Sequence, residues 1–205
     1  GAASAACGDT HAQAAEVPQS AIEQAFADAL AQDLYADSAG QAVRWRSLLN
    51  QAQEQGDVGV PWLVRGQTRL ASTLEYSDQA DVAQAEGQKA LDLIAGNGLE
   101  GTDLEAEALI VMATILIDNK QLDRGAVMVS QALALSERLY GPQSALASQA
   151  HNAAGTLAYA RGRYIEADRE FGAAARLAEA CQAPDDPAVV NQLASHAGTL
   201  FMTGQ

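Results

Sequence analysis

The stretch AGTLAYARGRYIEADREF, residues 154–171, decides the fold because parts of it recur about every 42 residues along the chain. Ala-Gly-Thr-Leu occurs at 154–157 and again at 197–200. In the same register, Ala-Thr-Ile stands at 113–115 and Ala-Ser-Thr at 71–73. A repeat of this length is typical of stacked helical units, each of which buries its apolar face only against its neighbours.

A second set of strings marks the other half of each unit. KALDL at 89–93, QALAL at 131–135 and AAARL at 173–177 are spaced by 42 residues. Apolar residues recur at three- and four-residue spacing, which indicates amphipathic helices. The sequence therefore predicts four helix pairs and a final unpaired helix. The predicted pairs are about 20–37 with 40–55, 61–75 with 78–95, 103–118 with 121–138, and 145–160 with 163–181, followed by a last helix at 187–203.

Helix boundaries are marked by capping and breaking residues. Ser20 with Glu23, and Thr102 with Glu105, have the spacing of a capping box, in which each side chain bonds to the other's backbone amide. Gly56 and the Gly-Pro pair at 141–142 are expected to end helices between units. We expect a single helical repeat domain over 20–205.

The first nineteen residues are rich in Ala, Ser and Gly and are expected to be flexible. Of the two cysteines, Cys7 lies in this segment and Cys181 ends a predicted helix, and we expect no disulfide between them. The Ala-Ser-Ala at 3–5 is similar to the end of a cleaved secretory signal. It slightly favours a periplasmic or otherwise exported location, with a cytoplasmic one left open. Ten Arg against two Lys, with abundant Ala, favours a bacterial source.

Composition restricts the class of partner. A net charge of −14 argues against nucleic acid, which selects basic surfaces, and disfavours anionic membrane surfaces. The longest apolar run, 108–117, is too short to cross a bilayer. The expected partner is a protein or peptide of neutral or basic character.

No motif predicts catalysis, a cofactor or a metal site. GNGLEG at 96–101 matches the dinucleotide-binding string, but it falls between two helices, whereas that site needs a preceding strand. The three histidines have no metal-ligand spacing, and no serine or cysteine has a histidine arrangement that indicates a nucleophile. The carboxylates are expected to lie on solvated helix surfaces. We therefore expect a protein that is not an enzyme.

The fourth predicted pair resembles a tetratricopeptide repeat (TPR). Gly155 stands where this family lets two helices approach closely, and Gly162 stands at the turn between them. The next positions of the pattern are Tyr164, Ala167, Phe171 and Ala174. The longer unit and the string GRYIEA are most similar to the kinesin-light-chain type of repeat. The resemblance implies an all-α, right-handed superhelical solenoid of antiparallel helix pairs, and it weakens toward the N-terminus.

In this family the first helix of each pair lines a concave groove that binds peptides. Carried over residue by residue, the resemblance implies these candidate groove residues: Arg65, Thr68, Arg69, Ser72, Thr114, Gln149, Asn152, Thr156 and Tyr159. The same face carries Glu75, Tyr76, Glu107, Ile110, Ile117, Asp118 and Ala160.

The repeated hydroxyl residues and the Trp-Arg-Arg cluster on this face can each be interpreted as a binding feature or as a structural one. The hydroxyls of Ser72, Thr114, Thr156 and Thr199 either form a ladder for an extended peptide or bond to their own helix backbone. Trp62, Arg65 and Arg69 either clamp an acidic ligand or serve the core and internal ion pairs.

The resulting functional hypothesis is a non-catalytic scaffold that binds a protein or peptide through its concave surface. The alternative is a structural module that self-associates, as a homodimer, through the final helix at 187–203. That helix is expected to expose an apolar face made of Val189, Val190, Leu193, Leu200 and Phe201. The same face would otherwise serve as the cap of the array.

Overall fold

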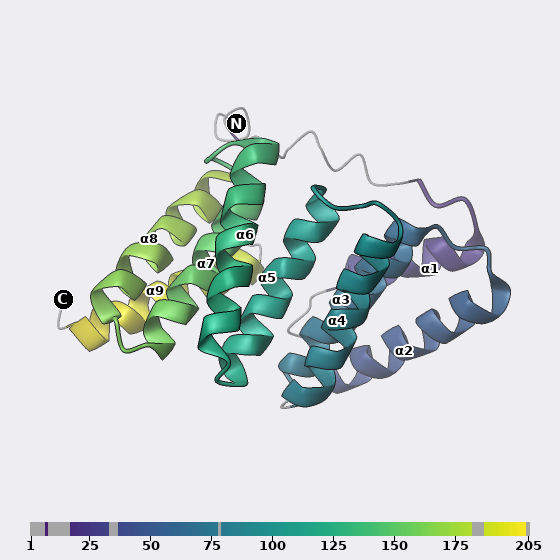
Figure 1. Ribbon diagram of the computed structural model, residues 1–205, viewed down its shortest axis with the longest axis horizontal. Helices are drawn as coiled ribbons and strands as arrows, with labels where there is room; N and C mark the ends of the chain where they lie inside the picture. Colours follow the sequence, from purple (N-terminus) through teal and green to yellow (C-terminus); the bar gives the residue numbers. More distant parts are fainter. Residues whose placement is uncertain (1–6, 8–16, 33–36, 78, 182–186, 204–205) are drawn as a thin grey trace.

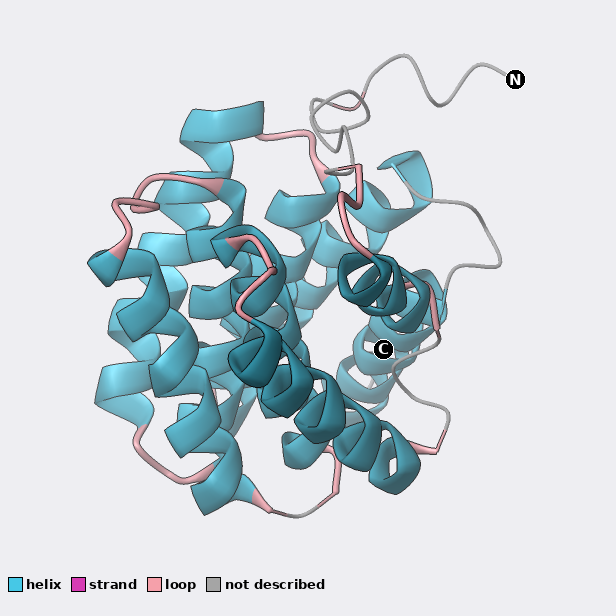
Figure 2. Cartoon of the chain, turned by 90° about the vertical axis from the view of Figure 1, so that its right-hand side faces the viewer, coloured by secondary structure: helices cyan, strands magenta, loops and turns pink. Residues whose placement is uncertain are grey.

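The chain folds into helices joined by short loops, with no strand among the residues that the structure describes (Figure 2). The structure is a computed structural model, and it describes residues 7, 17–32, 37–77, 79–181 and 187–203. The helices are α1 (Ala21–Leu30), α2 (Ser38–Gln55), α3 (Val60–Glu75), α4 (Ala80–Gly96), α5 (Asp103–Asp118), α6 (Leu122–Tyr140), α7 (Ala145–Ala160), α8 (Tyr164–Cys181) and α9 (Pro187–Thr203).

Consecutive helices pack as antiparallel pairs, and the pairs stack from α1 and α2 at one end to α8 and α9 at the other (Figure 1). The first helices of successive pairs also contact one another, α3 against α5 and α5 against α7. This confirms the predicted solenoid of four pairs with a final helix, which packs on α8.

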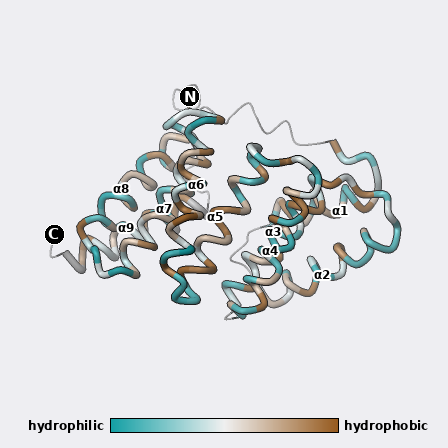
Figure 3. The backbone as a smooth tube through the Cα atoms, viewed as in Figure 1, coloured by the Kyte–Doolittle hydropathy of each residue, from teal (hydrophilic) through white to brown (hydrophobic). Residues whose placement is uncertain are grey.

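The core is a ribbon that runs along the array. Hydrophobic residues are spread over every helix rather than gathered in one segment (Figure 3). At the first pairs, Phe26 and Trp45 are almost fully buried with their rings 5.8 Å apart in an edge arrangement. Farther along, Met112, Ile115 and Leu116 of α5 fill the centre. This continuous burial is what stacking of amphipathic units requires.

Glycine allows the closest approach in the fourth pair, as predicted. A Cβ built on Gly155 would lie only 2.6 Å from the ring of Phe171 on α8. Gly162, at φ 72°, makes the turn between α7 and α8 in a backbone conformation that favours glycine. The glycine-rich string at 96–101 forms the loop between α4 and α5.

Two local predictions were wrong. The first helix ends at Leu30 rather than near residue 37, and the exposed Ala31 and Gln32 follow it. Thr102 makes no side-chain cap, because its hydroxyl donates instead to the carbonyl of Leu99 at 2.6 Å.

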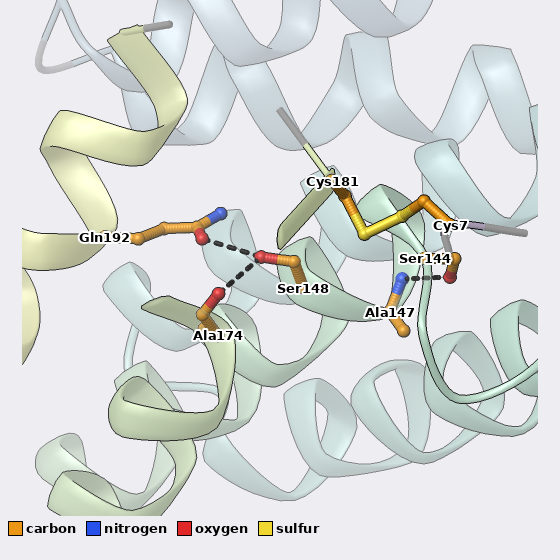
Figure 4. Close-up of a disulfide and its surroundings, with 7 residues drawn as sticks. All are labelled: Cys7, Ser144, Ala147, Ser148, Ala174, Cys181 and Gln192. Carbon is orange, nitrogen blue, oxygen red and sulfur yellow. Dashed lines mark hydrogen bonds between the residues drawn. A yellow bond between two sulfur atoms is a disulfide. The ribbon is translucent and has the colours of Figure 1, made fainter. Parts of the chain in front are cut away.

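The prediction that Cys7 and Cys181 are not bonded was also wrong. They form a disulfide with Cα atoms 5.4 Å apart, and Cys7 is buried beside the start of α7 (Figure 4). No local pattern predicts this contact, because the two cysteines are 174 positions apart in the chain. The expected flexibility of residues 1–19 otherwise falls largely outside the described residues.

Buried polar contacts fasten the last helices beside this disulfide. Ser148 Oγ on α7 is hydrogen-bonded to the Ala174 carbonyl at 2.7 Å and to the Gln192 side-chain amide at 2.6 Å (Figure 4). Ser148 and Gln192 are both buried. The Ser148 hydroxyl therefore links three helices, α7, α8 and α9, through hydrogen bonds.

Candidate functional site

The candidate site is the side of α3, α5 and α7 that carries the predicted groove positions, which we call the inner face. It is inner because the first helices of the pairs pack on one another, which shortens this side of the stack. Residues at i, i+3, i+4 and i+7 share one helix face, so Arg65, Thr68, Ser72 and Glu75 form one stripe along α3. The residues at the corresponding repeat positions of α5 and α7 form equivalent stripes along those helices.

The first part of the α3 stripe is occupied by ion pairs. Arg65 lies 3.5 Å from a carboxylate oxygen of Asp103 and 3.9 Å from one of Glu107, both on α5. Trp62 is buried in the core. This geometry favours the internal-pair interpretation of Arg65 over a clamp for an acidic ligand, because its guanidinium already has two carboxylates.

Burial raises the pKa of Glu107, the Arg65 guanidinium lowers it, and Asp103 and Arg69 act on it more weakly in opposite directions. Glu107 thus keeps a raised pKa despite two arginines. The general expectation that carboxylates lie on solvated helix surfaces does not hold for two acids on this face. Both Glu75 and Glu107 are partly buried between α3 and α5.

The far end of the α3 stripe carries the carboxyl of Glu75, which bonds to a hydroxyl, whereas Glu107 faces an arginine. Glu75 accepts a hydrogen bond from the Thr114 hydroxyl of α5, at 3.2 Å. Burial raises its pKa to about 8, the hydrogen bond from Thr114 opposes that shift, and the neighbouring Asp118 carboxylate adds to it. Asp118 also has a raised pKa, through burial, against the opposing charge of Lys120.

The predicted hydroxyl positions bond largely to their own helices. Thr114 Oγ1 is 2.9 Å from the Val111 carbonyl, Thr156 Oγ1 is 3.0 Å from that of Asn152, and Thr199 Oγ1 is 2.8 Å from that of His196. These bonds favour the local interpretation over a peptide-binding ladder. Ser72, at the equivalent place on α3, is buried.

Two polar atoms on the inner face are buried without a hydrogen-bond partner. They are Thr68 Oγ1 on α3 and Asn152 Oδ1 on α7, at equivalent positions two repeats apart. Between them, α5 presents the buried Ile110. The sequence marked both residues as candidates but gave no sign that they lack partners inside the protein.

The remaining candidates lie around this stretch. Gln149 is partly exposed and Arg69 lies close enough to Glu107 to act on its pKa. Tyr159 is 45% exposed and packs its ring edge-on against Tyr164, with the centroids 5.4 Å apart. The inner face therefore changes along the array, from charged at α3 and α5 to neutral and aromatic at the end of α7.

The apolar face of α9 differs from the predicted one at two of its five residues, one of which is the partly buried Leu200. Val189 is buried, whereas Val190, Leu193 and Phe201 are exposed, Phe201 by 83%. His196 Nε2 lies 3.2 Å from Asp168 of α8, which helps to hold α9 on the array. The helix is thus part cap and part exposed surface.

His151 on α7 is partly buried, with Nδ1 2.8 Å from Glu170 of α8. Burial would raise the pKa of Glu170, but bonds from His151 and Arg169 outweigh it and lower that pKa.

Over the described ranges, no group of three His, Cys, Asp or Glu side chains is placed to hold a metal ion. The helices in the same ranges include none with the length and apolarity needed to span a membrane.

The fold matches solved TPR-like structures of the kinesin-light-chain type. The crystal structure of BtubC (BKLC) from P. vanneervenii aligns with a TM-score of 0.66 and 23% identity, over 89% of this chain and 73% of that chain. A Podosopora anserina putative kinesin light chain with nearly identical TPR-like repeats aligns with a TM-score of 0.61 and 11% identity, over 90% and 87%. No protein-family model matches this chain, and no curated protein matches its sequence. The predicted resemblance to TPR-like repeats of the kinesin-light-chain type is confirmed at the level of fold.

Proposed function

We propose that the chain is a non-catalytic scaffold that binds a protein or peptide segment along the inner face. One observation carries this proposal: Thr68 and Asn152 each hold a buried oxygen that has no hydrogen-bond partner. Buried polar groups without partners are rare in folded proteins, and the backbone amides of a ligand would supply the missing bonds. The TPR-like fold supports the proposal, since helical repeat arrays present extended concave surfaces to partners.

The spacing of the two oxygens suits an extended segment. Neighbouring packed helices lie about 8–10 Å apart, so positions two repeats apart are separated by about 20 Å. An extended peptide rises about 3.3 Å per residue and covers that distance in about six residues. Ile110 lies between the two polar positions and offers an apolar contact to the middle of the segment.

The test compares two double variants. Thr68→Val with Asn152→Ala removes both oxygens from the inner face, and Ser130→Ala with Gln131→Ala changes two exposed side chains on the outer helix α6. Both variants must match the wild type in helicity and melting before they are compared. Each protein is used to capture partners from extract, and any captured partner is then purified and titrated directly.

We expect a partner that binds the wild type and the α6 variant with equal affinity and the inner-face variant at least tenfold more weakly. Equal binding by all three proteins would contradict an inner-face site. In that case the partner uses the outer helices or α9.

Self-association through α9 is the second candidate function. It rests on the exposed Val190, Leu193 and Phe201, which form an apolar surface on one helix. Light scattering across the micromolar range tests it, with Phe201→Ser as the variant expected to dissociate a dimer. A wild type that stays monomeric at every concentration would remove this function.

The disulfide supports the proposed exported location. Disulfides persist in oxidising compartments and are rare where thiols are kept reduced. A cysteine pair that is oxidised in protein isolated from its native source is the expected result, and free thiols there would contradict the location.

A further inference from the structure

Glu75 lies on the inner face, and the described groups that act on it are a hydroxyl and another carboxyl. Its carboxylate accepts a bond from the Thr114 hydroxyl at 3.2 Å, and the charged side chain that acts on it is Asp118, another carboxylate. Farther along the stripe, Arg65 and Arg69 act on Glu107. Lys120, after α5, acts on Asp118. Among the residues that the structure describes, the far end of the α3 stripe therefore brings together two carboxyl groups, Glu75 and Asp118, and Lys120 acts on Asp118 alone.

Glu107 provides an internal comparison for Glu75. Both are partly buried acids on the inner face between α3 and α5. Glu107 faces Arg65 at 3.9 Å, whereas Glu75 faces a hydroxyl. A carboxyl shielded from solvent needs a counter-charge as well as hydrogen bonds when it is ionised, and among the described residues Glu75 has a hydroxyl where Glu107 has an arginine.

A second, independent observation is the Thr68 hydroxyl on the same stripe. Thr68 is 8% exposed, and its Oγ1 has no hydrogen-bond partner. By contrast, the hydroxyls of Thr73, Thr114 and Thr156 all bond to carbonyls of their own helices. Thr68 lies two turns before Glu75, between that carboxyl and the pair formed by Arg65 and Glu107. Thr68 Oγ1, which has no hydrogen-bond partner among the described residues, thus lies on the same side of α3 as the Glu75 carboxyl.

We propose that this part of the inner face, Thr68 and Glu75 of α3 with Thr114 and Asp118 of α5, binds a Lys or Arg side chain of an extended peptide segment. The cation lies between the two carboxyl groups, and the Thr68 hydroxyl bonds to the backbone of the same segment. The inference rests on the proposed function and names its ligand class. A net charge of −14 acts in the same direction, because it attracts basic partners at long range.

Binding of a cation to this site depends on pH. In the free protein the Glu75 carboxyl is largely protonated below its pKa of about 8. A ligand cation stabilises the ionised form, so binding releases a proton at neutral pH. The affinity therefore rises by up to about tenfold per pH unit between pH 6 and 8, and then levels off.

The test uses three labelled octapeptides as probes, in which Ala alternates with Lys, Gln or Glu. Binding is followed by fluorescence anisotropy at low and at moderate salt. Glu75→Gln with Asp118→Asn removes the two inner-face acids and keeps their shape. The matched control, Glu137→Gln with Glu179→Gln, makes the same change of charge at exposed positions on α6 and α8. Glu75→Gln alone is titrated from pH 6 to 9.

We expect the Lys probe to bind the wild type best, the inner-face variant at least tenfold more weakly, and the control within twofold of the wild type. The pH dependence should disappear in Glu75→Gln. Equal weakening in the two double variants would overturn the site, since long-range attraction would then explain the binding. Binding of the Gln or Glu probe that equals that of the Lys probe would overturn the ligand class and leave the peptide-binding function intact. Failure of all three probes to bind would overturn the basic-ligand site, whereas the proposed function is overturned only by the capture experiment with the Thr68→Val and Asn152→Ala variant.

Discussion

The contact between α3 and α5 and the contact between α7 and α8 both pack apolar side chains and both carry an ion pair, but they differ in a further feature. The first uses ion pairs and a buried carboxyl, with Arg65, Glu107 and Glu75 between the helices. The second places the Phe171 ring directly on Gly155. Close packing of apolar groups stabilises a fold directly, whereas buried charges stabilise it weakly. The α7–α8 contact therefore stabilises the fourth pair, and the α3–α5 contact holds the groups that we propose a ligand completes.

The largest effect is expected at the close contact between Gly155 of α7 and Phe171 of α8. Phe171→Ala should lower the free energy of unfolding by about 3–5 kcal/mol, because it leaves a cavity against Gly155 that the helices cannot close. Urea unfolding followed by helicity measures it. Ile165→Ala on the same helix is the control, since Ile165 is 84% exposed and its loss should cost under about 0.5 kcal/mol. Similar losses in both variants would contradict the assigned packing.

The disulfide comes next. Cys7→Ser with Cys181→Ser should destabilise the fold by about 2–4 kcal/mol, because the bridge closes a long loop in the unfolded chain. Reductant should lower the urea midpoint of the wild type and leave that of the double variant unchanged. If reductant shifts neither protein, the cysteines are not bonded to each other.

At the contact between α3 and α5 we expect a substitution that raises the free energy of unfolding instead of lowering it. The pKa of Glu75 is raised from 4.5 to about 8 in the folded protein, so stability is full at acidic pH and falls as pH rises between these values. Glu75→Gln should therefore be more stable than the wild type by about 4 kcal/mol at pH 8 and equal to it near pH 4. Unfolding midpoints measured across this range test it. A wild type whose stability rises with pH relative to the variant would contradict the assignment.

The smallest effect is expected at the partly exposed ion pairs. Arg65→Gln should cost about 1 kcal/mol or less, because Arg65, Asp103 and Glu107 all retain solvent contact. The same change should raise the pKa of Glu107 further, as it removes the stronger of its two cations. Carboxyl titration by NMR measures that shift. A lowered pKa for Glu107 would show that Arg65 does not act on it.

The fold could be predicted because its signal repeats. Each unit places small residues at the same register, so Gly155 and Gly162 identify a helical pair even without knowledge of its neighbours. The first pair lacks these markers, and there the prediction extended α1 beyond Leu30. Local propensity does not report where tertiary contacts stop.

The candidate site was only partly predictable. Register placed Thr68, Glu75 and Asn152 on the inner face, but their significance depends on what surrounds them. The unpartnered oxygens and the pKa of Glu75 follow from burial between helices that are about forty residues apart in sequence. The disulfide is the extreme case, since no pattern near Cys7 indicates a neighbour at Cys181.

That bridge changes the mechanics of the array. A solenoid with free ends behaves as a spring, since small rotations between units add up to a large change in length. Here the chain from Cys7 to Cys181 is a closed ring, and residues 8–20 link the bridge to the first helix. Thirteen residues reach at most about 45 Å when fully stretched. Tension beyond that length is carried by covalent bonds, so the curvature of the inner face has a fixed lower limit under load.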